Sequence, residues 1–157
     1  MALAVKRAYE KPARRDGTRV LVDRLWPRGL TKEAAAVDLW LRELAPSHEL
    51  RKWYHENRGA GTLFRSRYSR ELRKPEATKA LQQLYELMSR NKPVTLLFAS
   101  TDLQHNNAVA LKELLEGSRK PPAGRLRSIA HANRNPASRR QKALHEYSRP
   151  SLRIRQP

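Results

Sequence analysis

Short runs of aliphatic and β-branched residues alternate along the chain with longer stretches whose apolar residues recur at helical spacing. The short runs occupy residues 5–9, 18–25 and 94–99, and each is expected to form a strand. The first is suited to the edge of a sheet, whereas the last is an unbroken apolar run typical of the centre of a parallel sheet. Strands that alternate with helices in this order predict an α/β fold with helices on the faces of the sheet.

Five helices are predicted from the spacing of the remaining apolar residues. They are expected at residues 31–36, 47–57, 62–73, 75–90 and 103–116. Thr31 and Ser47 carry the side-chain oxygens that cap helix N-termini, and Pro75 suits a first helical turn.

Residues 37–45 are compatible with two structures. Val37, Leu41 and Leu44 share one face of a helix, whereas Leu39 also fits the alternation of a strand with Val37 and Leu41. Periodicity alone does not distinguish a helix from a strand over so short a run.

The charge of the chain divides it into two parts. The 157 residues have the size of one domain and a net charge of +18. Residues 1–116 contain 22 basic and 14 acidic side chains, whereas residues 117–157 contain 11 basic side chains and one acidic one. The second part is also rich in proline and too poor in apolar residues to offset the entropy of ordering. We therefore expect an α/β domain at residues 1–116 and a disordered basic tail at residues 117–157.

The charge of this tail attracts polyanions such as nucleic acid. Its candidate residues for binding phosphates without sequence preference are Arg125, Arg127, Arg134, Arg139 and Arg140. The alternative is a tail that only solubilises the protein or extends it in one lineage, and the composition favours neither.

Several classes of protein are excluded by what the sequence lacks. There is no cysteine, which rules out disulfides, thiolate chemistry and cysteine-ligated metals. The five histidines form no pair at metal-binding spacing, and no glycine-rich nucleotide motif occurs, so the sequence indicates no metal and names no cofactor. The apolar stretch at the N-terminus is too short for a signal peptide, and no apolar run is long enough for a membrane span. We expect a cytoplasmic protein that does not enter membranes.

The first candidate site follows the second predicted strand, because ligands bind at the carboxyl ends of parallel strands. Asp23, Arg24, Trp26 and Arg28 leave this strand end together. Two guanidinium groups can grip a phosphate or carboxylate, and an indole can stack on a base or a sugar. The alternative is structural, with Asp23 paired to an arginine, Trp26 in the core and Arg28 in solvent.

The second candidate site follows the apolar strand at residues 94–99. It consists of polar side chains at the start of the last predicted helix: Ser100, Thr101, Asp102, His105, Asn106 and Asn107. A helix N-terminus attracts anions, although helix capping alone would explain any one of the first three residues. Asp23 and Asp102 could form a carboxylate pair for acid–base chemistry, but nearby arginines would hold both ionised.

Three separated strings of residues resemble the motifs of one family. They are RVLVDRLWPRGLTKEAAAVDLW, LRELAPSHELRKWY and VTLLFASTDLQHNNAVALKELL. They resemble the bacterial domain-of-unknown-function family 488, in its YeaO-like branch, over about residues 5–116. The resemblance implies a Rossmann-like, three-layer α/β domain whose short, mostly parallel sheet is flanked by helices. It also favours a strand at residues 37–45.

The family has no agreed activity, so the resemblance implies positions more than a reaction. Its motif residues, carried onto this chain, are Asp23, Arg24, Trp26, Pro27, Arg28, Gly29, Pro46, Ser47, Leu50, Arg51, Trp53, Asp102, Asn106 and Asn107. Relatives usually have Asn-His, or Cys-His in a related branch, where this chain has Asn106-Asn107. Asparagine cannot act as an acid or a base near neutral pH. Either His105 takes over that role, or this protein is not an acid–base catalyst.

The expected function is the binding of a small anionic ligand, phosphate-like or nucleotide-like, at the strand carboxyl ends. Arg24 and Arg28 would clamp the anion, Asp23 would orient Arg24 or the ligand, and the second candidate site would form the opposite wall. The alternative is a non-catalytic protein that associates with nucleic acid through its tail. Neither the ligand, nor a reaction, nor the oligomeric state follows from the sequence.

Overall fold

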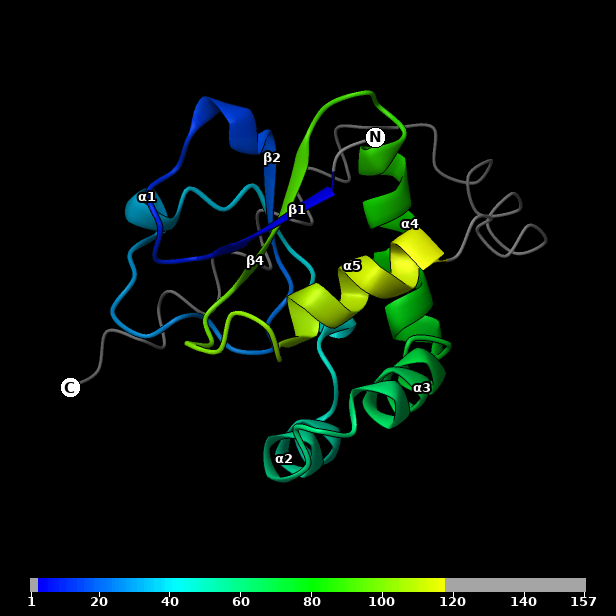
Figure 1. Cartoon of the computed structure of the whole chain (residues 1–157). Helices are drawn as coiled ribbons and strands as arrows, with labels where there is room; N and C mark the ends of the chain where they lie inside the picture. The colour runs from blue at the N-terminus through cyan, green and yellow to red at the C-terminus, as the bar shows by residue number, and fades with distance from the viewer. Residues whose placement is uncertain (1–2, 118–157) are drawn as a thin grey trace.

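The computed structural model describes residues 3–117 of the chain and shows a four-stranded, all-parallel sheet (Figure 1). The strands are β1 (Leu3–Arg7), β2 (Thr18–Leu21), β3 (Leu39–Trp40) and β4 (Val94–Phe98), in the order β1-β4-β2-β3. All five residues of β4 are buried between its two neighbours, which confirms the central strand. The expected tail and its five candidate arginines lie outside the described residues, except for Gly117.

The observed strands differ from their predicted bounds. β1 is an edge strand as expected, but its five residues are shifted to Leu3–Arg7, and β2 ends at Leu21 and not at Leu25. At residues 37–45 the strand is limited to Leu39–Trp40, and a 3-10 turn follows at Arg42–Leu44. The physical reason lies in the neighbouring strand, because β2 ends at Leu21 and its carbonyl accepts a last hydrogen bond from the Leu41 N–H, at 2.9 Å. Beyond that point β3 has no backbone to pair with.

The five predicted helices are present. They are α1 (Lys32–Ala35), α2 (His48–Glu56), α3 (Gly61–Glu71), α4 (Pro75–Met88) and α5 (Asn107–Gly117). Thr31 caps α1 by accepting from the Ala34 N–H at 3.1 Å, and Ser47 caps α2 by accepting from the Leu50 N–H at 3.1 Å, as expected. The last helix begins at Asn107 and not at Leu103, because the Asp102 carboxylate accepts from the N–H groups of the two residues before Asn106 and holds a turn there.

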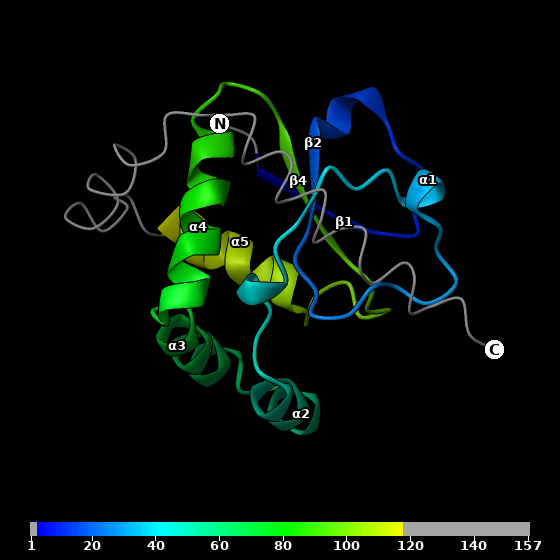
Figure 2. The same ribbon diagram turned by 180° about the vertical axis from the view of Figure 1, so that it is seen from behind.

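The domain has three layers of unequal thickness, which confirms the α/β class (Figures 1 and 2). On one face of the sheet, α3, α4 and α5 bury a large core that includes Phe64, Leu84, Leu96 and Leu111. The other face is covered by the single turn of α1 and the loops around it, over a small core that contains Trp26, Trp40, Leu21 and Leu97. Among residues 3–117 no helix is long and apolar enough to cross a membrane.

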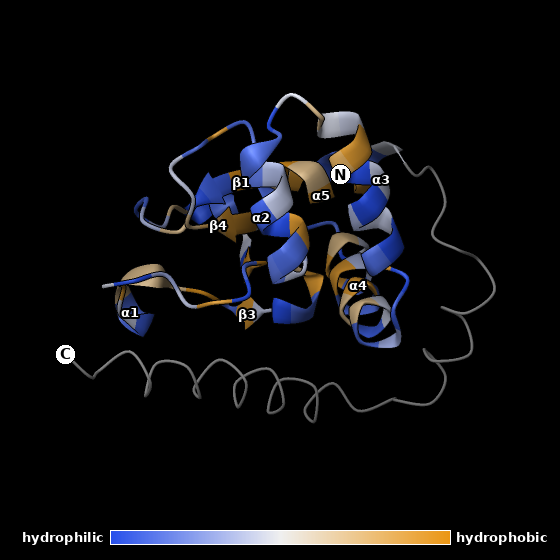
Figure 3. Cartoon of the chain, turned by 90° about the horizontal axis from the view of Figure 1, so that it is seen from below, coloured by the Kyte–Doolittle hydropathy of each residue, from blue (hydrophilic) through white to orange (hydrophobic). Residues whose placement is uncertain are grey.

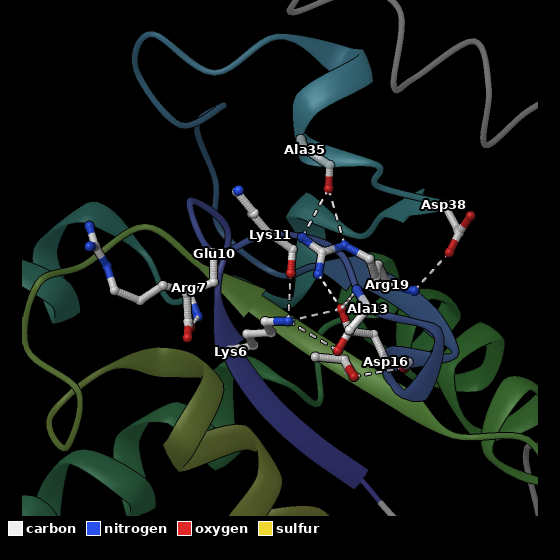
Figure 4. Close-up of polar contacts among 10 residues, drawn as sticks. Lys6, Arg7, Glu10, Lys11, Ala13, Asp16, Arg19, Ala35 and Asp38 are labelled. Atoms are coloured by element: carbon white, nitrogen blue, oxygen red, sulfur yellow. Dashed lines mark hydrogen bonds and ion pairs between the residues drawn. The ribbon is translucent and has the colours of Figure 1, made fainter.

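A buried ion pair holds the amino end of the sheet (Figure 4). The Arg19 guanidinium lies 2.6 Å from the Asp16 carboxylate, and both side chains are about 95% buried. Lys6 donates to the same carboxylate at 3.1 Å, and Arg19 also donates twice to the Ala35 carbonyl, at 3.1 and 3.0 Å. This cluster joins the start of β2 to α1 and to Lys6, which lies near the end of β1.

Candidate functional site

The largest described cavity, of about 920 Å³, lies at the carboxyl ends of β2 and β4. Three segments line it: the loop after β2, the helix α2 with the turn that follows it, and the loop between β4 and α5. In Figure 1, α2 lies below the sheet, on the side where β4 ends. Seen from below, the outer side of α2 is mostly hydrophilic (Figure 3). The cavity therefore opens between a polar helix and two strand-end loops.

The two strand-end motifs lie side by side, as expected for neighbouring parallel strands. The Asp23 carboxylate accepts from the Ala99 N–H at 2.8 Å, and the Asn107 amide donates to the Val22 carbonyl at 2.8 Å. These two hydrogen bonds join the loop after β2 to the loop after β4. Asp23 is 7% exposed and lies at the floor of the cavity.

The pKa values of the two candidate carboxyl groups move in opposite directions. Burial raises the pKa of Asp23, although the Ala99 N–H, the Asn107 amide and the charge of Arg51 partly oppose this. The pKa of Asp102 is lowered, chiefly because its carboxylate accepts from the backbone N–H groups of His105 and Gln104. Burial therefore dominates at Asp23, and backbone N–H groups dominate at Asp102.

Asp102 is the centre of a charged cluster at the rim. Its carboxylate lies 3.2 Å from His105 Nδ1 and 3.3 Å from the Arg58 guanidinium. Arg58 also approaches His55 Nδ1 at 3.1 Å, so this residue of the α2–α3 turn contacts both walls. The ring of Tyr54 lies edge-to-face with the His105 ring at 6.3 Å. The cluster connects the turn after α2 to the loop before α5.

Seven of the ten predicted ligand-binding residues line the cavity: Asp23, Ser100, Thr101, Asp102, His105, Asn106 and Asn107. Arg24, Trp26 and Arg28 are not brought to it. Arg24 points toward the carbonyls of Ala45 and Pro46, at 3.4 and 3.5 Å, and lines a separate cavity of about 290 Å³.

Trp26 lies in the core and Arg28 in solvent, which is the structural alternative to ligand binding. The Trp26 indole is buried, donates to the Leu30 carbonyl at 2.7 Å and packs edge-to-face against Trp40 at 5.7 Å. The Arg28 side chain is exposed, and its backbone carbonyl accepts from the Tyr9 hydroxyl at 2.8 Å. Neither residue reaches the cavity, so the structure does not join Arg24 and Arg28 into a clamp there.

Sequence reasoning missed the contribution of α2. His48, Arg51, Lys52 and His55 of this helix line the cavity, and Arg58 of the next turn does so as well. None of these residues was among the predicted ligand-binding residues, although Arg51 belongs to the motif shared with the family. All three histidines of residues 3–117 line this one cavity. Within the same residues, no group of three or more histidine, cysteine, aspartate or glutamate side chains could hold a metal ion.

These features define a class of protein: a small all-parallel α/β domain with a cavity at the carboxyl edge of its sheet that is lined by cations, carboxyl groups and imidazoles. The chain belongs to domain-of-unknown-function family 488, because the family model described as "Inactive DUF488-N3 subclade" matches residues 2–131. The predicted resemblance is thereby confirmed.

Curated relatives that match most of the chain carry no assigned activity in their names. The chain is 38% identical to the uncharacterized protein YeaO of Escherichia coli K12 over 116 residues, which cover 73% of this chain and 97% of YeaO. It is 41% identical to uncharacterized proteins of Mycobacterium tuberculosis and Mycobacterium bovis over 113 residues, which cover 72% of this chain and 92% of each relative. No solved structure matches the chain significantly.

Proposed function

We propose that the protein binds a small anionic ligand, phosphate-like or nucleotide-like, in the cavity at the carboxyl edge of the sheet. The observation that carries this proposal is the lining of one cavity by three fixed cations, Arg51, Lys52 and Arg58, together with three imidazoles. Cations that line a concave, low-dielectric site attract anions and can donate charge-assisted hydrogen bonds to them. Three acidic residues also line the cavity: Asp23, Glu56 and Asp102. Burial raises the pKa of Asp23, and Asp102 already has partners in His105 and Arg58.

The size of the cavity suits a small molecule. A volume of about 920 Å³ lies within the range of ligand pockets, roughly 300–1,000 Å³. The position is also the one at which parallel α/β sheets bind ligands. Both points support a ligand of nucleotide size over a bare ion.

Binding without catalysis is favoured by the position of Asn107. Its amide is held by the Val22 carbonyl and by Asp23, and it has no group that can exchange a proton near neutral pH. The family description also contains the word "Inactive". We therefore propose that the cavity is a ligand-binding site without acid–base chemistry at this position.

Replacing Arg51 with glutamine is expected to weaken the binding of 5′-AMP about tenfold, since a charge-assisted hydrogen bond contributes about 1.5–3 kcal/mol. Isothermal titration calorimetry of the full chain at near-physiological salt measures this loss. The matched control is Arg70→Gln, which removes the same charge from an exposed position on α3 that lines none of the described cavities. Equal affinities in the two variants, or no saturable binding of 5′-AMP or inorganic phosphate, would contradict the proposal.

The second candidate function is the association of the basic tail with nucleic acid. It is favoured by the 11 basic side chains and one acid within residues 117–157. The last 26 residues of the chain also lie beyond the match to the family model. This function is compatible with a ligand site in the folded domain.

Deleting residues 118–157 is expected to abolish most non-specific binding of DNA or RNA, because counterion release from phosphates drives such binding. Gel shifts at several salt concentrations should show a steep loss of affinity for the full chain as salt rises. The slope should decrease when Arg139 and Arg140 are replaced with glutamine. Equal binding by the full-length and shortened proteins, or binding by neither, would remove the tail from the functional account.

A further inference from the structure

A second, smaller cavity shares a wall with the proposed ligand site. It has a volume of about 430 Å³ and lies between the start of α3 and the first turns of α5. The two cavities have five lining residues in common: Tyr54, Arg58, Phe64, His105 and Asn106. The shared residues stand between the two spaces, so a ligand in one cavity lies next to the other.

The wall between the two cavities is formed by residues of α2, the α2–α3 turn, α3 and the loop before α5. Arg58 is the cation of this wall, since it lines both cavities while it pairs with Asp102 at 3.3 Å. Gly59 and Gly61 flank the turn on the side of the smaller cavity. Gly59 is exposed and a Cβ atom there would meet nothing within 4 Å, so this residue leaves the rim of the smaller cavity open.

The smaller cavity contains a cation of its own. The Arg65 guanidinium lines it, donates to Glu113 at 3.0 Å and approaches the Thr62 hydroxyl at 3.4 Å. The Arg65 side chain is 40% exposed and Glu113 is 50% exposed. Such an exposed pair contributes little to stability, so an anion can replace the carboxylate at small cost.

We propose that the two cavities form one bipartite site for a ligand of dinucleotide size with two phosphate groups. This inference rests on the proposed function and extends it. One phosphate lies in the larger cavity beside Arg51 and Lys52, the second lies beside Arg65, and Arg58 stands between them. The rings of Tyr54 and His105 offer planar groups at the shared wall, where a base or a sugar of such a ligand can pack.

The test compares the affinities of two probes, 5′-AMP and the dinucleotide pApA, for the full chain by isothermal titration calorimetry. pApA is expected to bind at least tenfold more tightly than 5′-AMP. Arg65→Gln should reduce this preference to about twofold, because it removes the cation proposed to hold the second phosphate. Arg58→Gln should weaken the binding of both probes, because its guanidinium belongs to both cavities.

The matched control separates a ligand contact from a structural ion pair. Glu113→Gln removes the ion pair but keeps the Arg65 cation, so it should retain or increase the preference for pApA. An equal loss in Arg65→Gln and Glu113→Gln would overturn the inference. The inference would also be overturned if Arg65→Gln kept the full preference for pApA, because the preference would then come from the basic tail.

The two proposals fail in different ways. If 5′-AMP binds with the expected dependence on Arg51 and pApA binds no more tightly, the bipartite site is wrong and the proposed function stands. If neither probe shows saturable binding, the proposed function fails and the bipartite site fails with it.

Discussion

Gly17→Ala is expected to lower the free energy of unfolding by about 3 kcal/mol or more. Gly17 has φ +63°, and an added Cβ atom would lie 2.0 Å from the Pro93 carbonyl oxygen. That oxygen accepts from the Thr18 N–H at 2.9 Å. This hydrogen bond joins the first residue of β2 to the residue just before β4. The substitution therefore strains the backbone and displaces the start of the central strand pair. Thermal unfolding should show a melting temperature lower by roughly 10 °C.

Gly29→Ala is the control for this prediction. Gly29 also has a positive φ, +71°, but an added Cβ atom would meet nothing within 4 Å. Gly29→Ala should lower the free energy of unfolding only by the strain of a left-handed backbone at alanine, about 1–2 kcal/mol. If both alanine variants lose the same stability, the close approach of Gly17 to Pro93 does not constrain the fold.

Arg19→Leu is expected to destabilise the domain by about 3–5 kcal/mol, because it leaves a buried carboxylate without its closest partner. Asp16 would keep only Lys6 and the Ala13 N–H, and the Ala35 carbonyl would lose both of its guanidinium donors. Chemical denaturation measures the change. Arg15→Leu, the same substitution at an exposed residue of the adjacent 3-10 turn, should change the stability by about 0.5 kcal/mol or less.

The same ion pair makes stability depend on pH. Burial alone would raise the pKa of Asp16, but the Ala13 N–H and the Lys6 and Arg19 side chains outweigh burial and lower it from 3.8. A lowered folded-state pKa stabilises the fold above the unfolded value, and this contribution is lost as the pH falls through the folded value. The stability difference between the unmodified protein and Asp16→Asn should therefore stay constant from about pH 7 to pH 5 and shrink below about pH 4. A difference that grows in acid would contradict the assignment.

The buried ion pair is separate from the proposed ligand site. Asp16 and Arg19 lie at the amino end of β2 and line none of the described cavities, whereas the proposed ligand contacts the carboxyl ends of the strands. Variants of the ion pair are thus suited to separate loss of fold from loss of binding. Variants of Arg51, Arg58 and Arg65 act on exposed or half-exposed side chains and test the ligand directly.

The local features of the chain were determined by the sequence alone. The apolar run at β4 has no polar face, so it requires cover on both sides and lies at the centre of a parallel sheet. Thr31 and Ser47 cap their helices because a side-chain oxygen reaches an N–H three residues away without help from distant parts of the fold. The two strand-end motifs meet because β2 and β4 are parallel neighbours, which places their carboxyl ends at one edge.

Only the tertiary structure decided where the loop side chains point and which helix completes the cavity. Arg24, Trp26 and Arg28 occupy one short loop, yet they point to a separate cavity, into the small core and into solvent. Their directions depend on residues distant in sequence, such as Trp40 and Ala45, which sequence spacing does not encode. Likewise, the basic residues of α2 form part of a cavity only because this helix lies across the strand ends. A helical pattern specifies which residues share a face, but packing determines what that face meets.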